Sequence, residues 1–301
     1  MIARIMLLMS LSQGIVLHFR MREWLSGGAS PSQGEGRGFE SRLALIFMKL
    51  PDGLPESFFI IREKRKIGQL TREIREKKNM DAFIWILDVV GTIAFSISGA
   101  MVGIRKRMDL FGVCVLGVVT ATGGGMTRDI VLGINPPRMF TNSTDVLIAA
   151  VTAILTFIVI YYANKKKQTH VGFREMYSLV LFVMDTLGLA IFTVIGIEVA
   201  LATRPDAGSF LLVFVGTITG VGGGLLRDMM SESIPYIFQK HIYATACIVG
   251  AVICVIFYRK LNISLNISMI VGAIAVLVIR ALAAQLRWNL PTIHLDEEGK
   301  S

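Results

Sequence analysis

The sequence contains little cysteine, little histidine and little charge. Its 301 residues include three cysteines and four histidines, with no CxxC pair and no set at metal-ligand spacing. Cys114, Cys247 and Cys254 all lie in apolar runs, where a thiol behaves as a small buried hydrophobe. There is also no nucleophile–base set, phosphate-binding loop or dinucleotide fingerprint. These absences argue against a disulfide scaffold and an enzyme, and no cofactor is expected.

Charged residues make up 18% of the chain and hydrophobic residues 53%, and the mean hydropathy is +0.62. Soluble domains usually contain about 25% charged residues. From Ala82 onward, apolar runs of about 20 residues recur, each long enough to cross the ~30 Å hydrocarbon core of a bilayer. The sequence therefore predicts an all-α polytopic membrane protein with the lipid bilayer as its partner.

Most of the net charge of +9 lies in residues 1–79, which hold 14 Lys and Arg against 8 Asp and Glu. The remaining basic residues gather in short loops, as topology signals do, so no nucleic-acid partner is expected. The pentapeptide GFESR at residues 38–42 can be encoded by DNA that matches the T-arm of a transfer RNA gene. We therefore expect residues 1–79 to be a disordered or spurious extension, with the true start at Met80 or Met48.

Seven apolar segments follow this extension, and the chain repeats itself across them. The segments cover about residues 82–103, 110–132, 144–163, 177–201, 209–230, 241–258 and 265–284. The pattern Asp-x-x-Gly-x-x-x-Phe-x-x-x-Gly at 88–99 recurs at 185–196, and Gly-Gly-Gly-x-x-Arg-Asp at 123–129 recurs at 222–228.

The repeat unit contains three spans, an odd number, so the second copy must cross the membrane in the opposite sense. This predicts an inverted repeat of three plus three transmembrane helices with an extra C-terminal helix. The expected parts are residues 80–168, 176–260, 264–285 and a tail at 286–301. Nine basic loop residues on one side against four on the other place the start of the first segment outside and the C-terminus in the cytoplasm.

The duplicated glycine stretches are costly in a membrane helix. Each interior glycine costs roughly 1 kcal/mol relative to alanine, and a charge near the bilayer centre costs about 2.5–3.5 kcal/mol. Consecutive glycines can bend or unwind a helix, and the freed carbonyl groups must then face protein, water or an ion. Two facing breaks would form a site for a monovalent cation or a small zwitterion. The residues of this candidate site are Gly123, Gly124, Gly125, Gly222, Gly223 and Gly224.

Close helix packing is the alternative explanation for these glycines, because small residues let two backbones approach. Apart from a monovalent cation at the glycines, no metal is expected. The charged residues that follow the glycines are adjacent in sequence, and adjacent residues project about 100° apart on a helix. We therefore predict that Arg128 pairs with Asp228, and Arg227 with Asp129, across the repeat axis. These residues would either line or gate a pore or lock the two halves together.

Two acids lie inside apolar sequence, Asp88 and Asp185, and an intramembrane acid is a site candidate by default. Either could instead bond a nearby broken helix. Glu198, near the end of the fourth segment, is expected at the membrane interface. Arg280 in the seventh segment is predicted to extend along the bilayer to the cytoplasmic face.

Six stretches resemble one known family: RKRMDLFGV (105–113), GGGMTRDIVLG (123–133), MDTLGLAIFTVIG (184–196), GVGGGLLRDMM (220–230), IPYIFQKHIYA (234–244) and LRWNLP (286–291). The chain is similar over residues 82–291 to bacterial homologues of the trimeric intracellular cation (TRIC) channels, also catalogued as glycine-transporter-domain membrane proteins. The resemblance implies a homotrimer in the bacterial inner membrane that passes potassium and sodium. It places a pore in each protomer between the second and fifth helices, kinked at Gly123–Gly125 and Gly222–Gly224. The alternative is a secondary transporter of glycine or another small amino acid.

The predicted start codon can be tested on the native protein. N-terminal mass spectrometry should identify a first residue at Met80 or Met48, because the upstream reading frame passes through sequence typical of a transfer RNA gene. Peptides from residues 1–47 would contradict this expectation.

Overall fold

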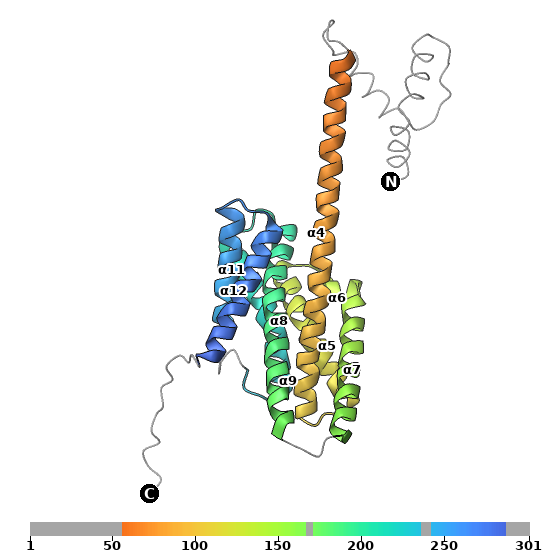
Figure 1. Ribbon diagram of the computed structural model, residues 1–301, viewed down its shortest axis with the longest axis vertical. Helices are drawn as coiled ribbons and strands as arrows, with labels where there is room; N and C mark the ends of the chain where they lie inside the picture. Colours follow the sequence, from red (N-terminus) through yellow and green to blue (C-terminus); the bar gives the residue numbers. More distant parts are fainter. Residues whose placement is uncertain (1–55, 167–170, 236–241, 287–301) are drawn as a thin grey trace, which may run out of the picture. The chain divides into compact units, whose positions relative to one another are not determined.

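The computed structural model of the protein describes residues 56–166, 171–235 and 242–286 (Figure 1). The chain forms two compact units, residues 1–70 and 71–301, and the membrane fold belongs to the second. The described elements are all helices: α4 (Glu56–Arg105), α5 (Leu110–Leu132), α6 (Arg138–Thr141), α7 (Thr144–Lys166), α8 (Val171–Thr203), α9 (Ser209–Met230), α11 (Ala244–Arg259) and α12 (Leu265–Gln285).

Six of these helices contain a stretch long and apolar enough to cross a membrane, and α11 is a shorter apolar helix. The six stretches are Met80–Arg105, Leu110–Leu132, Thr144–Lys165, Tyr177–Thr203, Ser209–Met230 and Leu265–Gln285. The predicted all-α polytopic fold is thus confirmed. α4 is already helical from Glu56, so its N-terminal part belongs to the segment expected to be an extension. Residues 1–55 lie outside the described residues, and the predicted start codon stays a prediction.

The same kind of turn ends the second helix of each repeat. After α5, Gly133 has a φ of 75°, and the amide of Ile134 donates to the Asp129 carbonyl at 2.8 Å. After α9, the equivalent residue Glu232 has a φ of 50°, and the amide of Ser233 donates to the Asp228 carbonyl at 2.9 Å. Left-handed residues of this kind close a helix by satisfying its last carbonyl groups. The repeat predicted from sequence is therefore present in backbone geometry.

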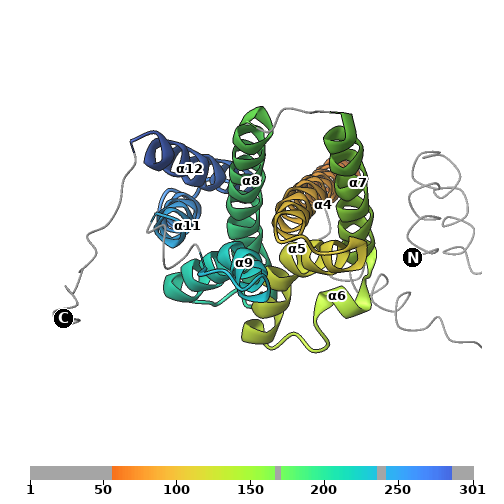
Figure 2. The ribbon, with the colours of Figure 1, turned by 90° about the horizontal axis from the view of Figure 1, so that it is seen from below.

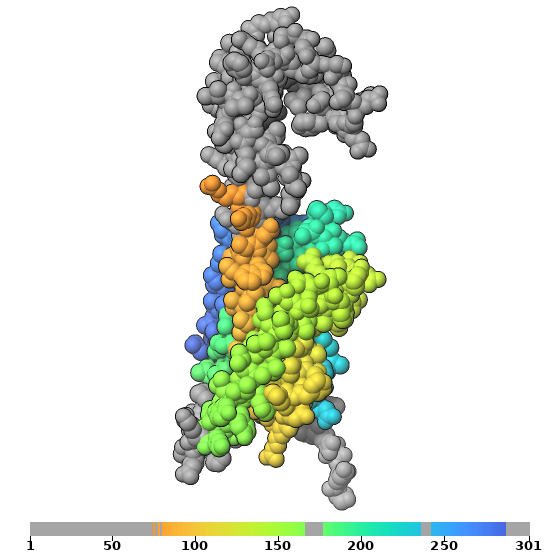
Figure 3. Space-filling model, turned by 90° about the vertical axis from the view of Figure 1, so that its right-hand side faces the viewer, coloured from red at the N-terminus to blue at the C-terminus, as the bar shows by residue number. Residues whose placement is uncertain are grey.

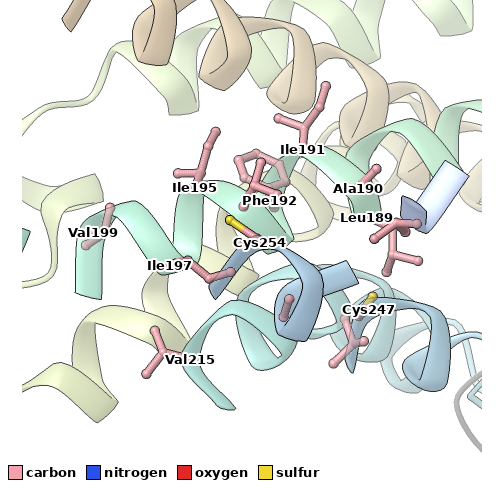
Figure 4. Close-up of a cluster of buried hydrophobic side chains, with 14 of the residues drawn as sticks. Leu189, Ala190, Ile191, Phe192, Ile195, Ile197, Val199, Val215, Cys247 and Cys254 are labelled. Carbon is pink, nitrogen blue, oxygen red and sulfur yellow. The ribbon is translucent and has the colours of Figure 1, made fainter. Parts of the chain in front are cut away.

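The helix at the centre of the bundle is α8. In its most apolar stretch 72% of residues are buried, against 11% in α7. Figure 2 shows α11 and α12 on one side of α8 and α4 and α7 on the other. Figure 4 shows the apolar cluster that α8 forms with Val215 of α9 and with Cys247 and Cys254 of α11. The three cysteines are free thiols, and two of them are buried in this bundle as expected.

The glycine stretches lie where α5 crosses α9. A Cβ atom at Gly124 would collide with the carbonyl oxygen of Thr219, and one at Gly223 with the carbonyl oxygen of Thr120. A Cβ at Gly222 would come within 3.0 Å of the Cα of Gly124. The two backbones therefore touch, as small residues allow in membrane helix pairs.

Both crossing helices are continuous α-helices through Gly123–Gly125 and Gly222–Gly224. The expectation that the glycines unwind the helices and free their carbonyl groups is therefore wrong, whereas a bend at the glycines stays a prediction. The physical reason is that removing the side chains already brings the backbones together, while each helix keeps its own hydrogen bonds. Close packing, the alternative explanation, is what the structure has.

The first and second helices of each repeat pack in the same way. A Cβ at Gly99 of α4 would lie 2.5 Å from Thr120 Oγ1, and one at Gly196 of α8 would lie 2.6 Å from Thr219 Oγ1. Both threonine hydroxyls donate to a carbonyl one turn earlier in their own helix, at 2.6 Å in each case. Equivalent atoms in the two repeats thus make equivalent contacts.

The crossing can be tested with two neighbouring substitutions. Gly124→Ala should destabilise the protein by about 1–3 kcal/mol, because overpacking against a rigid backbone cannot relax. Gly125→Ala is the matched control, because its Cβ would meet only the end of Arg128 at 3.6 Å, and it should be neutral or slightly stabilising. Thermal unfolding of the purified protein in detergent measures both. Equal melting temperatures for the two variants would contradict the crossing.

Candidate functional site

Each arginine that follows a glycine stretch pairs with the aspartate next to it in sequence. Arg128 Nε and Nη2 lie 2.9 and 2.8 Å from Asp129 Oδ1. Arg227 Nε and Nη2 both lie 2.8 Å from Asp228 Oδ1. The two repeats therefore build the same local pair, with two contacts to one carboxylate oxygen.

The predicted pairs across the repeat axis, Arg128 with Asp228 and Arg227 with Asp129, are wrong. The long arginine side chain bends back over the 100° that separates adjacent residues, so a neighbouring pair is feasible after all. In addition, α5 and α9 cross at their glycines and then diverge. The inverted repeat thus places the two pairs toward opposite ends of the bundle.

In the first repeat the charged residues form an incompletely paired group. Asp129 Oδ2 accepts the backbone N–H of Arg138 at 2.8 Å, which ties α5 to the start of α6. Asp88 is half-buried and lies within electrostatic range of Asp145, Arg128, Arg138 and Glu198. Among the described residues, no cation lies within ion-pair distance of the Asp88 carboxylate.

In the second repeat, Asp185 is the centre of a buried network. Its Oδ1 accepts from Arg227 Nη1 at 2.6 Å, and the same nitrogen donates to Ser98 Oγ of α4 at 2.5 Å. The hydroxyl of Tyr243 donates to Asp185 Oδ1 at 3.4 Å. Arg227 and Asp185 are 0% and 1% exposed, so these charges are held by one another and by hydrogen bonds.

Arg280, which the sequence placed at the membrane surface, is the fifth group in this network. It is 6% exposed, and its Nη2 lies 3.1 Å from Asp185 Oδ2. The prediction that it reaches the cytoplasmic face is therefore wrong. A buried carboxylate within reach stabilises the guanidinium inside the bundle, and the side chain has no need to leave it. Its position inside an apolar segment was the one signal that pointed to this role.

The predicted site residues therefore fall into three places in the structure. The glycines form the crossing of α5 and α9, Arg128 and Asp129 form one pair, and Arg227 and Asp228 join Asp185. Asp88 stands apart from both pairs. Sequence reasoning missed Arg280, Ser98 and Tyr243 as partners, because they come from helices distant in sequence. Within the described residues, no group of three His, Cys, Asp or Glu is arranged to hold a metal ion.

A two-fold inverted helical repeat with a close central crossing and buried charges toward both ends defines an integral membrane protein of the channel or transporter class. The model of the family described as "Glycine transporter" matches residues 85–161 and 182–259, one match in each repeat. The chain belongs to this family, which includes the bacterial homologues of the TRIC channels.

The similarity between this chain and proteins of known sequence or structure extends over most of the length of those proteins. The inner membrane protein YadS of Escherichia coli K12 is 40% identical over 217 residues, which is 72% of this chain and 99% of YadS. A membrane protein of Vibrio cholerae is 32% identical over 72% of this chain and 85% of its own length. The TRIC channel orthologue of Rhodobacter sphaeroides is 31% identical, with a TM-score of 0.60, over 68% of this chain and 98% of that structure.

A second solved TRIC cation channel, from a study of conductance, is 32% identical with a TM-score of 0.59 and covers 70% of this chain and 97% of its own. A prokaryotic TRIC channel solved in 0.5 M KCl is 29% identical with the same TM-score. These similarities confirm the resemblance inferred from the sequence motifs. The similar proteins are membrane proteins and channels.

The two equivalent aspartates should differ in their effect on stability. Asp185→Asn should cost about 3–5 kcal/mol, because it leaves the buried cations Arg227 and Arg280 without their shared carboxylate. Asp88→Asn should cost much less, because Asp88 is half-buried and holds no ion pair among the described residues. Thermal or denaturant unfolding in detergent compares them. A similar loss of stability in both variants would contradict a particular stabilising role for the Asp185 network.

Proposed function

We propose that the protein is a channel for monovalent cations, potassium and sodium, with one path in each protomer between α5 and α9. The observation that carries the proposal is the central crossing of two glycine-rich helices with buried charges placed toward both ends. This chain is about one third identical in sequence to solved TRIC cation channels. The similarity extends over nearly the full length of those structures. The solved neighbours are cation channels by description, which makes this the function that the fold supports best.

The proposed pore and ion-binding residues are Gly123, Gly124, Gly125, Gly222, Gly223, Gly224, Arg128, Asp129, Arg227, Asp228, Asp88 and Asp185. Gly124, Gly222 and Gly223 bring the backbones of the two helices into contact without side chains in between. Movement of α5 relative to α9 at this crossing would open a path between the two helices, lined at its narrowest point by the glycines. The charged residues would then set the electrostatic potential at the two ends of the path.

The protein is a multi-pass membrane protein, and we place it in the bacterial inner membrane as a homotrimer, like its relatives. The Rhodobacter sphaeroides neighbour is described as a trimeric channel. Phe111 of α5 and Phe210 of α9, equivalent residues in the repeat, are 76% and 83% exposed. Apolar rings exposed to this extent suit contact with lipid or with a second protomer.

We further propose the orientation and limits that the sequence predicts. The start of the first span lies outside and the C-terminus in the cytoplasm, following the basic loops. The repeats comprise residues 80–168 and 176–260, followed by the seventh helix at 264–285 and a tail at 286–301. Residues 1–79 stand outside the two repeats.

Transport of glycine or another small zwitterion is the rival function, because the matching family is described as a glycine transporter. Planar bilayers and liposomes with the same purified protein distinguish the two. A channel gives discrete potassium current steps, because ions pass without a conformational cycle for each one. A carrier gives saturable uptake of labelled glycine that shows counterflow, and no unitary currents.

We expect potassium current steps from the wild-type protein and no glycine counterflow. Liposomes without protein serve as the negative control, and Gly124→Ala, whose Cβ would collide with the Thr219 carbonyl oxygen, tests whether the current depends on the crossing. Counterflow of glycine without unitary current would overturn the proposed channel and favour the carrier.

A further inference from the structure

The two repeats differ by one buried charge. Arg280 comes from α12, the seventh helix, which has no counterpart in the first repeat. α12 packs against α8 and α11: a Cβ at Gly272 would meet Cys254 Cβ at 2.8 Å and Val194 Cγ1 at 3.3 Å. From this position it inserts Arg280 beside Asp185. Nothing equivalent approaches Asp88 among the described residues.

In the first repeat, the position that corresponds to the place of α12 is an open groove. The groove lies between α4, α7 and the start of α8, and its volume is about 520 Å³. Its lining includes Ile97, which is the repeat equivalent of Val194, together with Ile93 and Leu155. Figure 3 shows α4 and α7, which supply two sides of the groove, on one face of the molecule. Among the described helices, none takes in the first repeat the place that α12 takes in the second.

The seat of Arg280 has the features of a cation site. Its guanidinium carbon lies 5.0 Å from the ring centre of Phe182 and 4.8 Å from that of Tyr243, and two aromatic faces attract a cation. Its Nη2 and Nε lie 3.2 and 3.3 Å from Thr186 Oγ1. The carboxylate of Asp185 completes the shell at 3.1 Å. An acid, a hydroxyl and two ring faces thus surround one positive charge.

The formal charges of the equivalent residues in the two repeats can be compared. In the second repeat Asp185 and Asp228 are balanced by Arg227 and Arg280, so the group is neutral. The equivalent residues of the first repeat are Asp88, Asp129 and Arg128, so this set has two carboxylates and one guanidinium, while Asp145, Glu198 and Arg138 also lie within electrostatic range of Asp88. Among the residues that are equivalent in the two repeats, Arg280 is thus an added cation at Asp185 that has no counterpart at Asp88 in the described part of the chain.

We propose that Arg280 is a built-in counter-ion that occupies the cation position at Asp185 and closes this half of the path to permeant ions. The inference rests on the proposed channel function and names the residue that regulates it. A mobile cation at Asp185 has to displace a tethered one that is already desolvated and hydrogen-bonded. Separation of Arg280 from Asp185, by movement of α12 on α8, opens that half.

Single-channel recording in planar bilayers tests the inference with Arg280→Met, which keeps the apolar length and removes the charge. Potassium current through this variant should rise about tenfold, at the low end of the enrichment that an uncompensated charge in a cleft produces. Arg280→Lys keeps a cation and should behave like the wild type. Arg105→Met removes an exposed charge at the end of α4 and is the matched control. The double variant Asp185→Asn/Arg280→Met restores neutrality and should lose the gain.

A second measurement separates an electrostatic role from a structural one. Potassium should raise the melting temperature of Arg280→Met in detergent more than a bulky organic cation does, and more than it raises that of the wild type. In Arg280→Ala, added guanidinium should suppress the extra current, because it fits the vacated position. A merely structural arginine predicts neither effect.

The outcomes for the function and for Arg280 are distinguishable. If the wild type passes potassium and Arg280→Met matches Arg105→Met, the inference is overturned while the channel stands. If no variant passes current, the proposed function fails, and the melting-temperature comparison alone decides whether Arg280 occupies a cation site. An Arg280→Met protein whose melting temperature ignores potassium counts against the inference in either case.

Discussion

The direct contact between the backbones of α5 and α9 positions every other group in the site. A Cβ at Gly124 or Gly223 would strike a carbonyl oxygen of the opposite helix, so the crossing is fixed at these residues. Arg128 and Arg227 each come three residues after the last glycine of their stretch, within one helical turn, so the Arg–Asp pairs follow the crossing directly. The inversion of the repeat then sends the two pairs toward opposite ends. One steric fact thus separates two charge clusters that the sequence alone would have joined.

Charge placement is the second level of organisation, and here the two repeats are unequal. Buried ion pairs are weak contributors to net stability, because desolvation cancels much of the attraction. Their presence inside the bundle is therefore consistent with the conduction path proposed above. The Asp185 network joins Ser98 of α4, Arg227 of α9, Arg280 of α12 and Tyr243 beside α11. Such a network can report the position of several helices at once.

Much of the fold could be predicted from particular residues. The apolar runs located the spans, since a bilayer demands about 20 apolar residues per helix. The repeated motifs at 88–99 and 185–196, and at 123–129 and 222–228, predicted the inverted repeat and led to the family. The site was predicted less well. Helix breaks at the glycines, pairs between repeats and a surface position for Arg280 were all wrong, because each depends on which helices meet in space.

The sequence by itself determined the number of apolar segments, their alternation across the membrane, the duplication and the positions of the buried charges. These follow from local composition and from spacing, which need no knowledge of neighbours. Only the tertiary structure decided which partner each charge takes. A guanidinium on a long side chain can reach an adjacent carboxylate, one on another helix, or the interface. The choice depends on distances of a few ångströms, set by glycine contacts between helices far apart in the chain. Arg280 shows this most clearly, because a segment outside the repeat supplies the charge that makes its two halves unequal.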